Sequence, residues 1–179
     1  MQDKPLLARL QVWNSDLGMG TSAYTFGLTF DAIHDALTPA ERDRLAKALV
    51  KGAIRPTLND WIDGKERIHS LDTMGHNRFS HIVFGAGVAA IAIKTEEPQA
   101  DAWIRRIDEA AQEWANYDGS AIETKPAHFA TNGAFVESIY YADFAAEGYL
   151  RFKRAWLDAF MEKPADTPRL ESLGDYFIQ

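Results

Sequence analysis

The sequence predicts an all-α fold, and three observations support this prediction. Nearly every segment between glycine and proline residues carries apolar side chains at helical spacings of three and four. No pair of segments alternates apolar with polar residues, and no Asn-Gly turn joins two β-rich runs. The 179 residues are 46% hydrophobic, which is enough for one soluble helical domain with a buried core.

Two helices are predicted in the first third of the chain. The first covers residues 22–37, and its apolar stripe consists of Phe26, Phe30, Ile33 and Leu37. The second begins after Thr38, because proline occupies the first helical position and Glu41 lies three residues after the cap. We expect Pro56 to end or kink this second helix, although apolar residues continue to Trp61.

A helix over residues 78–93 is apolar around most of its circumference and has glycine and alanine at its centre. Such a helix is usually buried, and its small residues allow neighbouring helices to approach closely. Three more helical stripes follow Pro98. They consist of Trp103, Ile107, Ala110, Ala111 and Trp114; of Phe135, Val136, Ile139 and Tyr140; and of Tyr149, Phe152, Trp156 and Phe160. Tyr140 and Tyr141 are therefore expected in the core.

Composition excludes several classes of protein. The 19 basic and 26 acidic residues give a formal net charge of −7, which argues against a general nucleic-acid binder. The absence of cysteine excludes disulfides, cysteine-ligated zinc, iron–sulfur clusters and thiol catalysis. No segment reaches the ~18 apolar residues of a membrane span. The N-terminus has no signal-peptide pattern, so we expect a cytosolic chain, an already processed one, or a piece of something longer.

Two long loops, residues 63–77 and 117–132, hold the unusual polar residues. Asn77 and Arg78 stand at the start of the apolar helix, where Asn77 is either a helix cap or, with Arg78, a carboxylate-binding group. His76 and His81 flank them, but they are five residues apart and not the three or four that a shared helical face needs. No metal site is therefore predicted.

The second loop begins with the turn signal Asp118-Gly119 and continues through Glu123, His128 and Asn132. Taken alone, this stretch is most simply an ordinary loop with exposed polar side chains. Asp118 and Glu123 are also candidates for the acid and base of a glycosidase, provided that the fold separates them correctly.

Together, the two clusters resemble those of the heparinase II/III-like and alginate-lyase-like polysaccharide lyases. The similarity comprises the Asn/His run before the Gly/Ala-rich helix and, about forty residues later, the Asp-Gly-x-x-x-Glu loop. Residues 13–17, Phe30-Asp31 and 37–42 also resemble helix pieces of that family, so that the likeness covers residues 6–160. It implies a partial (α/α) toroid of paired antiparallel helices. The β-sandwich domain that follows in the family is missing, which suggests a fragment or a protein that works as a homo-oligomer.

The resemblance implies β-elimination on an acidic polysaccharide or oligosaccharide that contains uronate, without a cofactor, in a secreted or periplasmic protein. Asn77 matches the family's carboxylate-binding asparagine, with His76 beside it, and His128 lies near the position of a family tyrosine that this chain lacks. These three are the candidate catalytic residues, and Tyr117, Tyr140 and Tyr141 are the fallback phenols for the proton transfers. The candidate substrate-binding residues are Arg78, His81, Glu123 and Asn132.

Two alternatives remain open at this point. One is a non-catalytic carbohydrate-binding or interaction domain of the same fold, which the missing tyrosine and missing β-domain favour. The other is a toroid glycoside hydrolase that uses Asp118 and Glu123.

Overall fold

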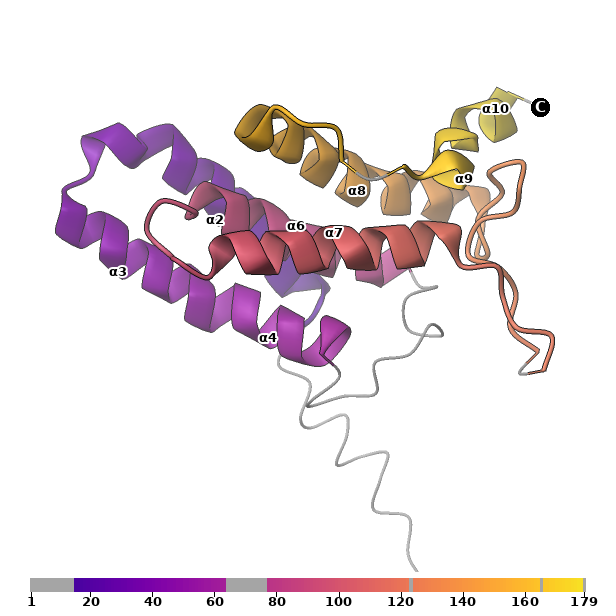
Figure 1. The fold of residues 1–179 in the computed structure, drawn as a ribbon, viewed down its shortest axis with the longest axis horizontal. Coiled ribbons are helices and arrows are strands. Elements are labelled where there is room, and N and C mark those ends of the chain that lie inside the picture. Colours follow the sequence, from indigo (N-terminus) through magenta and orange to yellow (C-terminus); the bar gives the residue numbers. More distant parts are fainter. Residues whose placement is uncertain (1–14, 64–76, 123, 165, 179) are drawn as a thin grey trace, which may run out of the picture.

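The computed structural model describes residues 15–63, 77–122, 124–164 and 166–178 and is helical almost throughout (Figure 1). Across these ranges there is no β-strand, only two isolated bridges in the loop after residue 116. The all-α prediction is therefore confirmed. In chain order the elements are α2 (Leu17–Ile33), η1 (His34–Ala36), α3 (Pro39–Leu49), η2 (Val50–Ile54), α4 (Arg55–Thr57), η3 (Leu58–Ile62), α6 (Asn77–Ala92), α7 (Ala100–Asn116), α8 (Ile139–Phe160), α9 (Pro168–Glu171) and α10 (Leu173–Ile178).

Helix α6 is the centre of the fold, as its all-round apolar sequence predicts. Nearly all of its side chains are buried, and α2, α7 and α8 each pack against it. Figure 1 shows α8 above and α3–α4 below, with α7 across the front. The aromatic side chains of the core meet between α6, α7, α8 and the loop that joins the last two. They are Phe79, Phe84, Trp114, Phe129, Tyr149 and Phe152.

The contacts of α6 fix the directions of its neighbours. Gly20 lies against His81 and Gly27 lies against Ala89, so α2 runs parallel to α6. Helix α8 is also parallel, because Gly148 meets Ser80 and Phe152 meets Gly87. Helix α7 is antiparallel, since Trp114 near its end stacks on Phe79 at the start of α6. The N-terminal ends of α2, α6 and α8 consequently lie at one end of the molecule.

A buried polar contact fixes the start of α2. The backbone N–H and the hydroxyl of Ser15 both donate to Asp60 Oδ2, at 2.8 and 2.7 Å. The indole of Trp61 donates to the Ser15 hydroxyl at 2.9 Å, and all three residues are buried. This network joins residues that are 45 or more positions apart, and it holds the beginning of α2 against η3.

Of the two expectations for Pro56, an end or a kink, the end is wrong, because the helical path that begins at Pro39 continues past Pro56. The chain stays helical to Ile62 through two π-helical turns, η2 and η3. The N–H of Arg55 bonds to the carbonyl of Val50, five residues back. This wider turn leaves Pro56 in the first turn of α4, where its missing N–H breaks no helical hydrogen bond. The start of this helix does follow the prediction, because Thr38 and Glu41 form a capping box.

Ile139 and Tyr140 of the second stripe predicted after Pro98, and the whole third stripe, belong to one helix, α8. Ser138 caps it by accepting a hydrogen bond from the Tyr141 N–H, and Phe135 lies in the loop before the cap. Tyr140 and Tyr141 are therefore first-turn residues, 75% and 43% exposed, and not core residues as expected. The Ser138 cap makes the helix begin later than the apolar stripe from Phe135 suggested.

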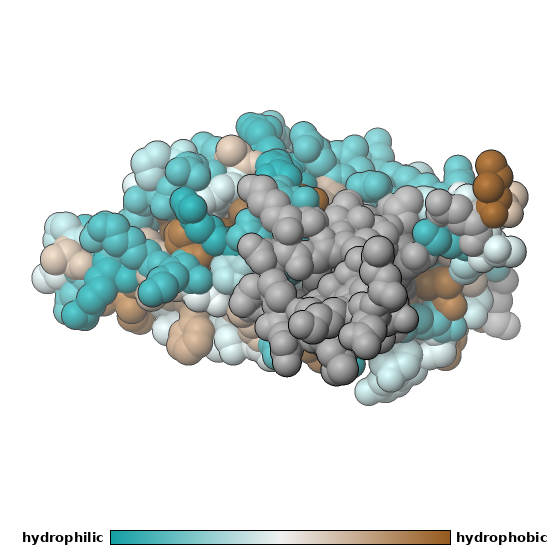
Figure 2. All heavy atoms as spheres, turned by 90° about the horizontal axis from the view of Figure 1, so that it is seen from below, coloured by the Kyte–Doolittle hydropathy of each residue, from teal (hydrophilic) through white to brown (hydrophobic). Residues whose placement is uncertain are grey.

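No helix among the described residues is both long and apolar enough to cross a membrane. On the face seen from below, hydrophilic side chains cover most of the described surface, and apolar ones form separate patches (Figure 2).

The close approach of α2 and α6 generates a stability prediction. A Cβ atom added to Gly85 would overlap the carbonyl oxygen of Gly20, which belongs to rigid helix backbone. We expect Gly85→Ala to lower the free energy of unfolding by about 1–3 kcal/mol, measured by urea denaturation. Gly52→Ala is the matched control, because nothing lies within 4 Å of its added Cβ. That variant should gain about 0.5–1 kcal/mol from its better helix propensity. Equal effects of the two substitutions would contradict the prediction.

Candidate functional site

The shared N-terminal end of α2, α6 and α8 contains the first polar cluster. Backbone N–H groups without intrahelical partners point outward at this end of each helix, and the helix dipoles place partial positive charge there. Three parallel helices of 17, 16 and 22 residues contribute in the same direction. This end of the molecule therefore favours negatively charged groups.

A carboxylate of the protein itself occupies the first turn of α6. The Asn77 backbone N–H and its side-chain Nδ2 both donate to Glu137 Oε2, at 3.1 and 2.7 Å. Asn77 is 8% exposed, and Glu137 directly precedes the cap of α8. The pair thus joins the beginnings of two helices, and it shows that the amide of Asn77 is placed to bind a carboxylate.

Arg78 is exposed and makes no hydrogen bond or ion pair with any described residue. Its guanidinium follows Asn77 directly at the same helix end. An arginine binds a carboxylate through two parallel N–H donors when one is present. Asn77 and Arg78 therefore supply adjacent donors at an end of the molecule that favours anions.

His81 lies one helical turn after Asn77 and connects α6 to α8. Its Nε2 donates to the Phe144 carbonyl oxygen at 2.7 Å, and its ring stacks on the Phe144 ring at 3.6 Å between centroids. Burial, opposed by this hydrogen bond and by Glu147, lowers the pKa of His81. The imidazole is therefore neutral near pH 7, with the Nδ1 atom unprotonated.

His128 is placed in the interior, at 2% exposed. Its Nδ1 donates to the carbonyl oxygen of Trp114 at 2.9 Å, and its ring lies 4.7 Å from that of Tyr117. These contacts fasten the loop between α7 and α8 to the end of α7. The Asn132 side chain accepts a hydrogen bond from the Ala134 N–H at 3.2 Å and thereby forms a local turn.

Asp118 forms an ion pair with Arg169 of α9. The same guanidinium donates to the carbonyl oxygens of Tyr117 and Phe129, so it ties the loop after α7 to the C-terminal segment. Its proposed hydrolase partner Glu123 lies outside the described residues, as does His76. The structure therefore brings Asn77, Arg78 and His81 together and places Asp118 in a different network.

Glu137 was not among the candidates predicted from the sequence, and Tyr140 and Tyr141, although fallback phenols, were expected in the core. All three lie at the start of α8, and Glu137 is bonded to Asn77 across 60 residues. The Ser138 cap was the available signal, because it places the residues that follow in an exposed first turn. Nothing in the sequence indicated the partner of Glu137.

Among the described residues, no group of three or more histidine, aspartate or glutamate side chains is arranged to hold a metal ion. Comparison of the chain with protein-family models, with curated proteins and with solved structures finds no match.

The lowered pKa of His81 predicts a pH dependence of stability. The unfolded chain takes up this proton near the ordinary value of 6.5, and the folded protein does so only at lower pH. Stability linked to His81 is therefore complete above pH 6.5 and is lost as the pH falls through the folded-state pKa. His81→Gln keeps a donor for the Phe144 carbonyl and should flatten this acid-side slope, measured by urea denaturation from pH 7.5 to 5.

The pKa of His34 changes stability with pH in the opposite direction, because hydrogen bonds to Glu96 and Asp35 raise it above 6.5. The stability linked to His34 is fully present below pH 6.5 and is lost as the pH rises through the raised folded-state pKa. Since His34 is the same in both proteins, the difference between wild type and His81→Gln isolates His81. Parallel pH profiles of the two proteins would show the prediction to be wrong.

Proposed function

We propose that this chain is a lyase-like helical domain that binds uronate-containing acidic polysaccharide at the N-terminal end of α6 and cleaves it by β-elimination. One observation carries the proposal: Asn77 already holds a carboxylate, through its backbone N–H and its side-chain amide. The side-chain amide has a second hydrogen, and the exposed guanidinium of Arg78 is adjacent. These donors suit the carboxylate of a uronate sugar.

Glu137 has a defined role in this proposal. By accepting two hydrogen bonds from Asn77, it fixes the orientation of the amide before substrate arrives. An amide whose orientation is fixed before binding loses less side-chain conformational entropy when it binds the substrate carboxylate. Glu137 is thus a positioning residue, and Asn77 with Arg78 binds the substrate.

The chemistry requires a base that removes the proton from C5 of the uronate and an acid that protonates the leaving oxygen. The C5 electron pair then forms the double bond to C4 as the C4–O bond breaks. His128 is 2% exposed, whereas Tyr140 and Tyr141 expose phenols within four residues of Glu137. We assign the proton transfers to this tyrosine pair. Hydrogen bonds from Asn77 and Arg78 to the uronate carboxylate acidify the C5 proton, because they stabilise the negative charge that develops when it leaves.

The proposal includes the partial toroid. The antiparallel direction of α7 relative to α2, α6 and α8 supports this part of the proposal, because a toroid pairs inner helices with outer ones of opposite direction. The alternative of a non-catalytic carbohydrate-binding domain is favoured by one specific observation, the burial of His128 against the Trp114 carbonyl. That alternative keeps the same carboxylate-binding residues.

Asn77→Ala tests the binding site. Removal of an amide that bonds a charged group should weaken the binding of a uronate oligosaccharide by about tenfold to a hundredfold, measured by isothermal titration calorimetry. Gln99→Ala is the control, because Gln99 is exposed at the start of the antiparallel α7, at the opposite end of the molecule from Asn77, and its side chain makes no capping hydrogen bond. Circular dichroism melting confirms that each variant is folded. Unchanged affinity in folded Asn77→Ala would remove Asn77 from the site.

Tyr140→Phe and Tyr141→Phe test the cleavage step. We expect each of them to lower the rate of unsaturated product formation by about a hundredfold or more, read as ultraviolet absorbance, with affinity unchanged. Tyr176→Phe in α10 serves as the control. If the wild-type protein binds the oligosaccharide but no absorbance develops, the non-catalytic alternative is correct. New reducing ends without absorbance would instead indicate a hydrolase.

A further inference from the structure

A groove lies between α2 and the helical path from α3 to η2. Figure 1 shows these segments as the two arms of a hairpin that turns at η1. The groove has a volume of about 410 Å³, which falls within the range of about 300–1,000 Å³ that is typical of small-molecule sites. Its walls include Phe26, Phe30 and Ile33 of α2 and Leu45, Leu49 and Gly52 of the second arm.

The described part of the chain leaves the apolar walls of this groove partly open to solvent. Phe26 is 62% exposed, and Ile33 and Leu45 are exposed as well. Gly52 widens the groove, since nothing lies within 4 Å of a Cβ atom added to it. Single exposed apolar residues are ordinary, but a contiguous apolar surface on two facing helices indicates a binding site.

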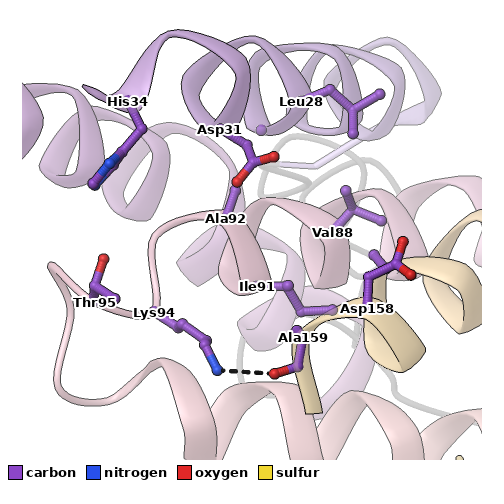
Figure 3. A pocket seen from close by; sticks show the side chains of 12 residues that line it. Leu28, Asp31, His34, Val88, Ile91, Ala92, Lys94, Thr95, Asp158 and Ala159 are labelled. Atoms are coloured by element: carbon purple, nitrogen blue, oxygen red, sulfur yellow. Dashed lines mark hydrogen bonds between the residues drawn. The ribbon is translucent and has the colours of Figure 1, made fainter. Parts of the chain in front are cut away.

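The side of α2 that faces α8 differs chemically from the side that faces α3. The cavity in Figure 3, between α2 and α8, contains the carboxylates of Asp31 and Asp158 and the ammonium of Lys94, which donates to the Ala159 carbonyl oxygen at 3.3 Å. Among the described residues, no charged side chain lines the groove between α2 and α3. Its interior therefore suits an apolar group.

Basic side chains follow the second arm beside the groove. Arg44, Lys47, Lys51 and Arg55 are exposed and follow one another at spacings of three and four residues, so they share one side of this helical path. Residues 39–55 contain five basic and two acidic residues, although the net charge of the whole chain is −7. The edge of the groove is therefore locally positive.

Two of these cations are free to bind a ligand. Arg44 and Lys51 make no hydrogen bond or ion pair with any residue of the described ranges, whereas Lys47 is already in an ion pair within α3. Arg44 directly precedes Leu45, and Lys51 directly precedes Gly52, so each stands next to a residue that lines the groove. An anionic group at this edge therefore meets two unengaged cations.

We propose that this groove binds a long-chain carboxylate, with the alkyl tail between α2 and α3 and the head group at Arg44 and Lys51. Met19 and Ile33 line the α2 wall and lie roughly 21 Å apart at the rise of an α-helix, so the groove is long enough for an extended chain. Apolar walls remove the alkyl tail from water, and a carboxylate accepts charge-assisted hydrogen bonds from arginine and lysine.

The size and charge of the groove favour this ligand over macromolecular partners. An α-helix with its side chains is about 10–12 Å wide, so a helix as long as the groove fills far more than 410 Å³. A second copy of this chain, packed symmetrically here, would bring two equally basic edges together. A membrane surface is flat, whereas these apolar side chains line a hollow.

This site is separate from the one proposed at Asn77. The groove lies on a different side of α2 from Gly20 and Gly27, which pack against α6. Binding of a long-chain carboxylate therefore goes beyond the proposed function and does not depend on it.

Isothermal titration calorimetry with dodecanoate and dodecyltrimethylammonium, both below their micelle-forming concentrations, tests the head-group contact. The two probes carry the same alkyl tail and opposite charges, and we expect the wild-type protein to bind dodecanoate about tenfold more tightly or better. The double variant Arg44→Gln, Lys51→Gln should weaken dodecanoate binding by about tenfold. The control is Arg105→Gln, Lys163→Gln, which changes net charge equally at exposed positions outside the groove and should stay within about twofold of wild type.

Gly52→Leu tests the tail contact, because its side chain would occupy the groove. We expect dodecanoate affinity to fall by about tenfold or more. Circular dichroism melting should show a folded protein, since a Cβ at this position meets open space. Gly174→Leu in α10 is the matched control: a Cβ added there also has nothing within 4 Å, and the residue lies outside the groove. It should bind dodecanoate like the wild-type protein.

Several outcomes would overturn the proposal. They are no binding of dodecanoate, equal affinity for the two probes, and unchanged dodecanoate affinity in folded Gly52→Leu. Sedimentation with vesicles of anionic phospholipid, without dodecanoate binding, would identify a membrane surface instead. A concentration-dependent dimer in light scattering that Gly52→Leu abolishes, again without dodecanoate binding, would identify a second copy. Each of these outcomes leaves the affinity test of Asn77→Ala unaffected.

Discussion

Close contact between the backbones of α2 and α6 is the constraint on which the rest of the structure depends. Gly20 and Gly85 bring the two helices so near that a single Cβ would overlap a carbonyl oxygen. Glycine in a helix interior lowers local stability by roughly 1 kcal/mol, so close packing must offset that cost. Helix α2 packs against one side of α6, α8 against another and α7 against a third. The apolar side chains around α6 are therefore nearly all buried.

The same packing makes the two ends of the molecule electrostatically different. Because α2, α6 and α8 are parallel, their N-terminal N–H groups face one end and their C-terminal carbonyls face the other. At the first end, Asn77 holds the carboxylate of Glu137. At the second end, the Lys94 ammonium donates to a carbonyl in the last turn of α8 and compensates its negative pole.

Local sequence signals predicted what depends on near neighbours. The Thr38–Glu41 capping box, the buried helix after residue 77 and the stripe that ends in Trp114 are all present. Where the structure differs from the sequence predictions, a local hydrogen-bond pattern competes with the proline or apolar pattern. Pro56 remained inside a helical path because a π turn preceded it, and Tyr140 became exposed because Ser138 capped α8. In each case a hydrogen-bond pattern of a few residues overrode the proline or apolar pattern.

By itself, the sequence determined that this chain is helical, that its central helix is buried and that thiol chemistry is absent, since these follow from periodicity and composition. It also marked Asn77 and Arg78 as a helix-terminal pair. Only the tertiary structure decided that Glu137 lies against Asn77 and that the phenols of Tyr140 and Tyr141 are exposed nearby. The physical reason is distance along the chain: a contact across 60 residues depends on how α6 and α8 pack, and no local pattern encodes that packing.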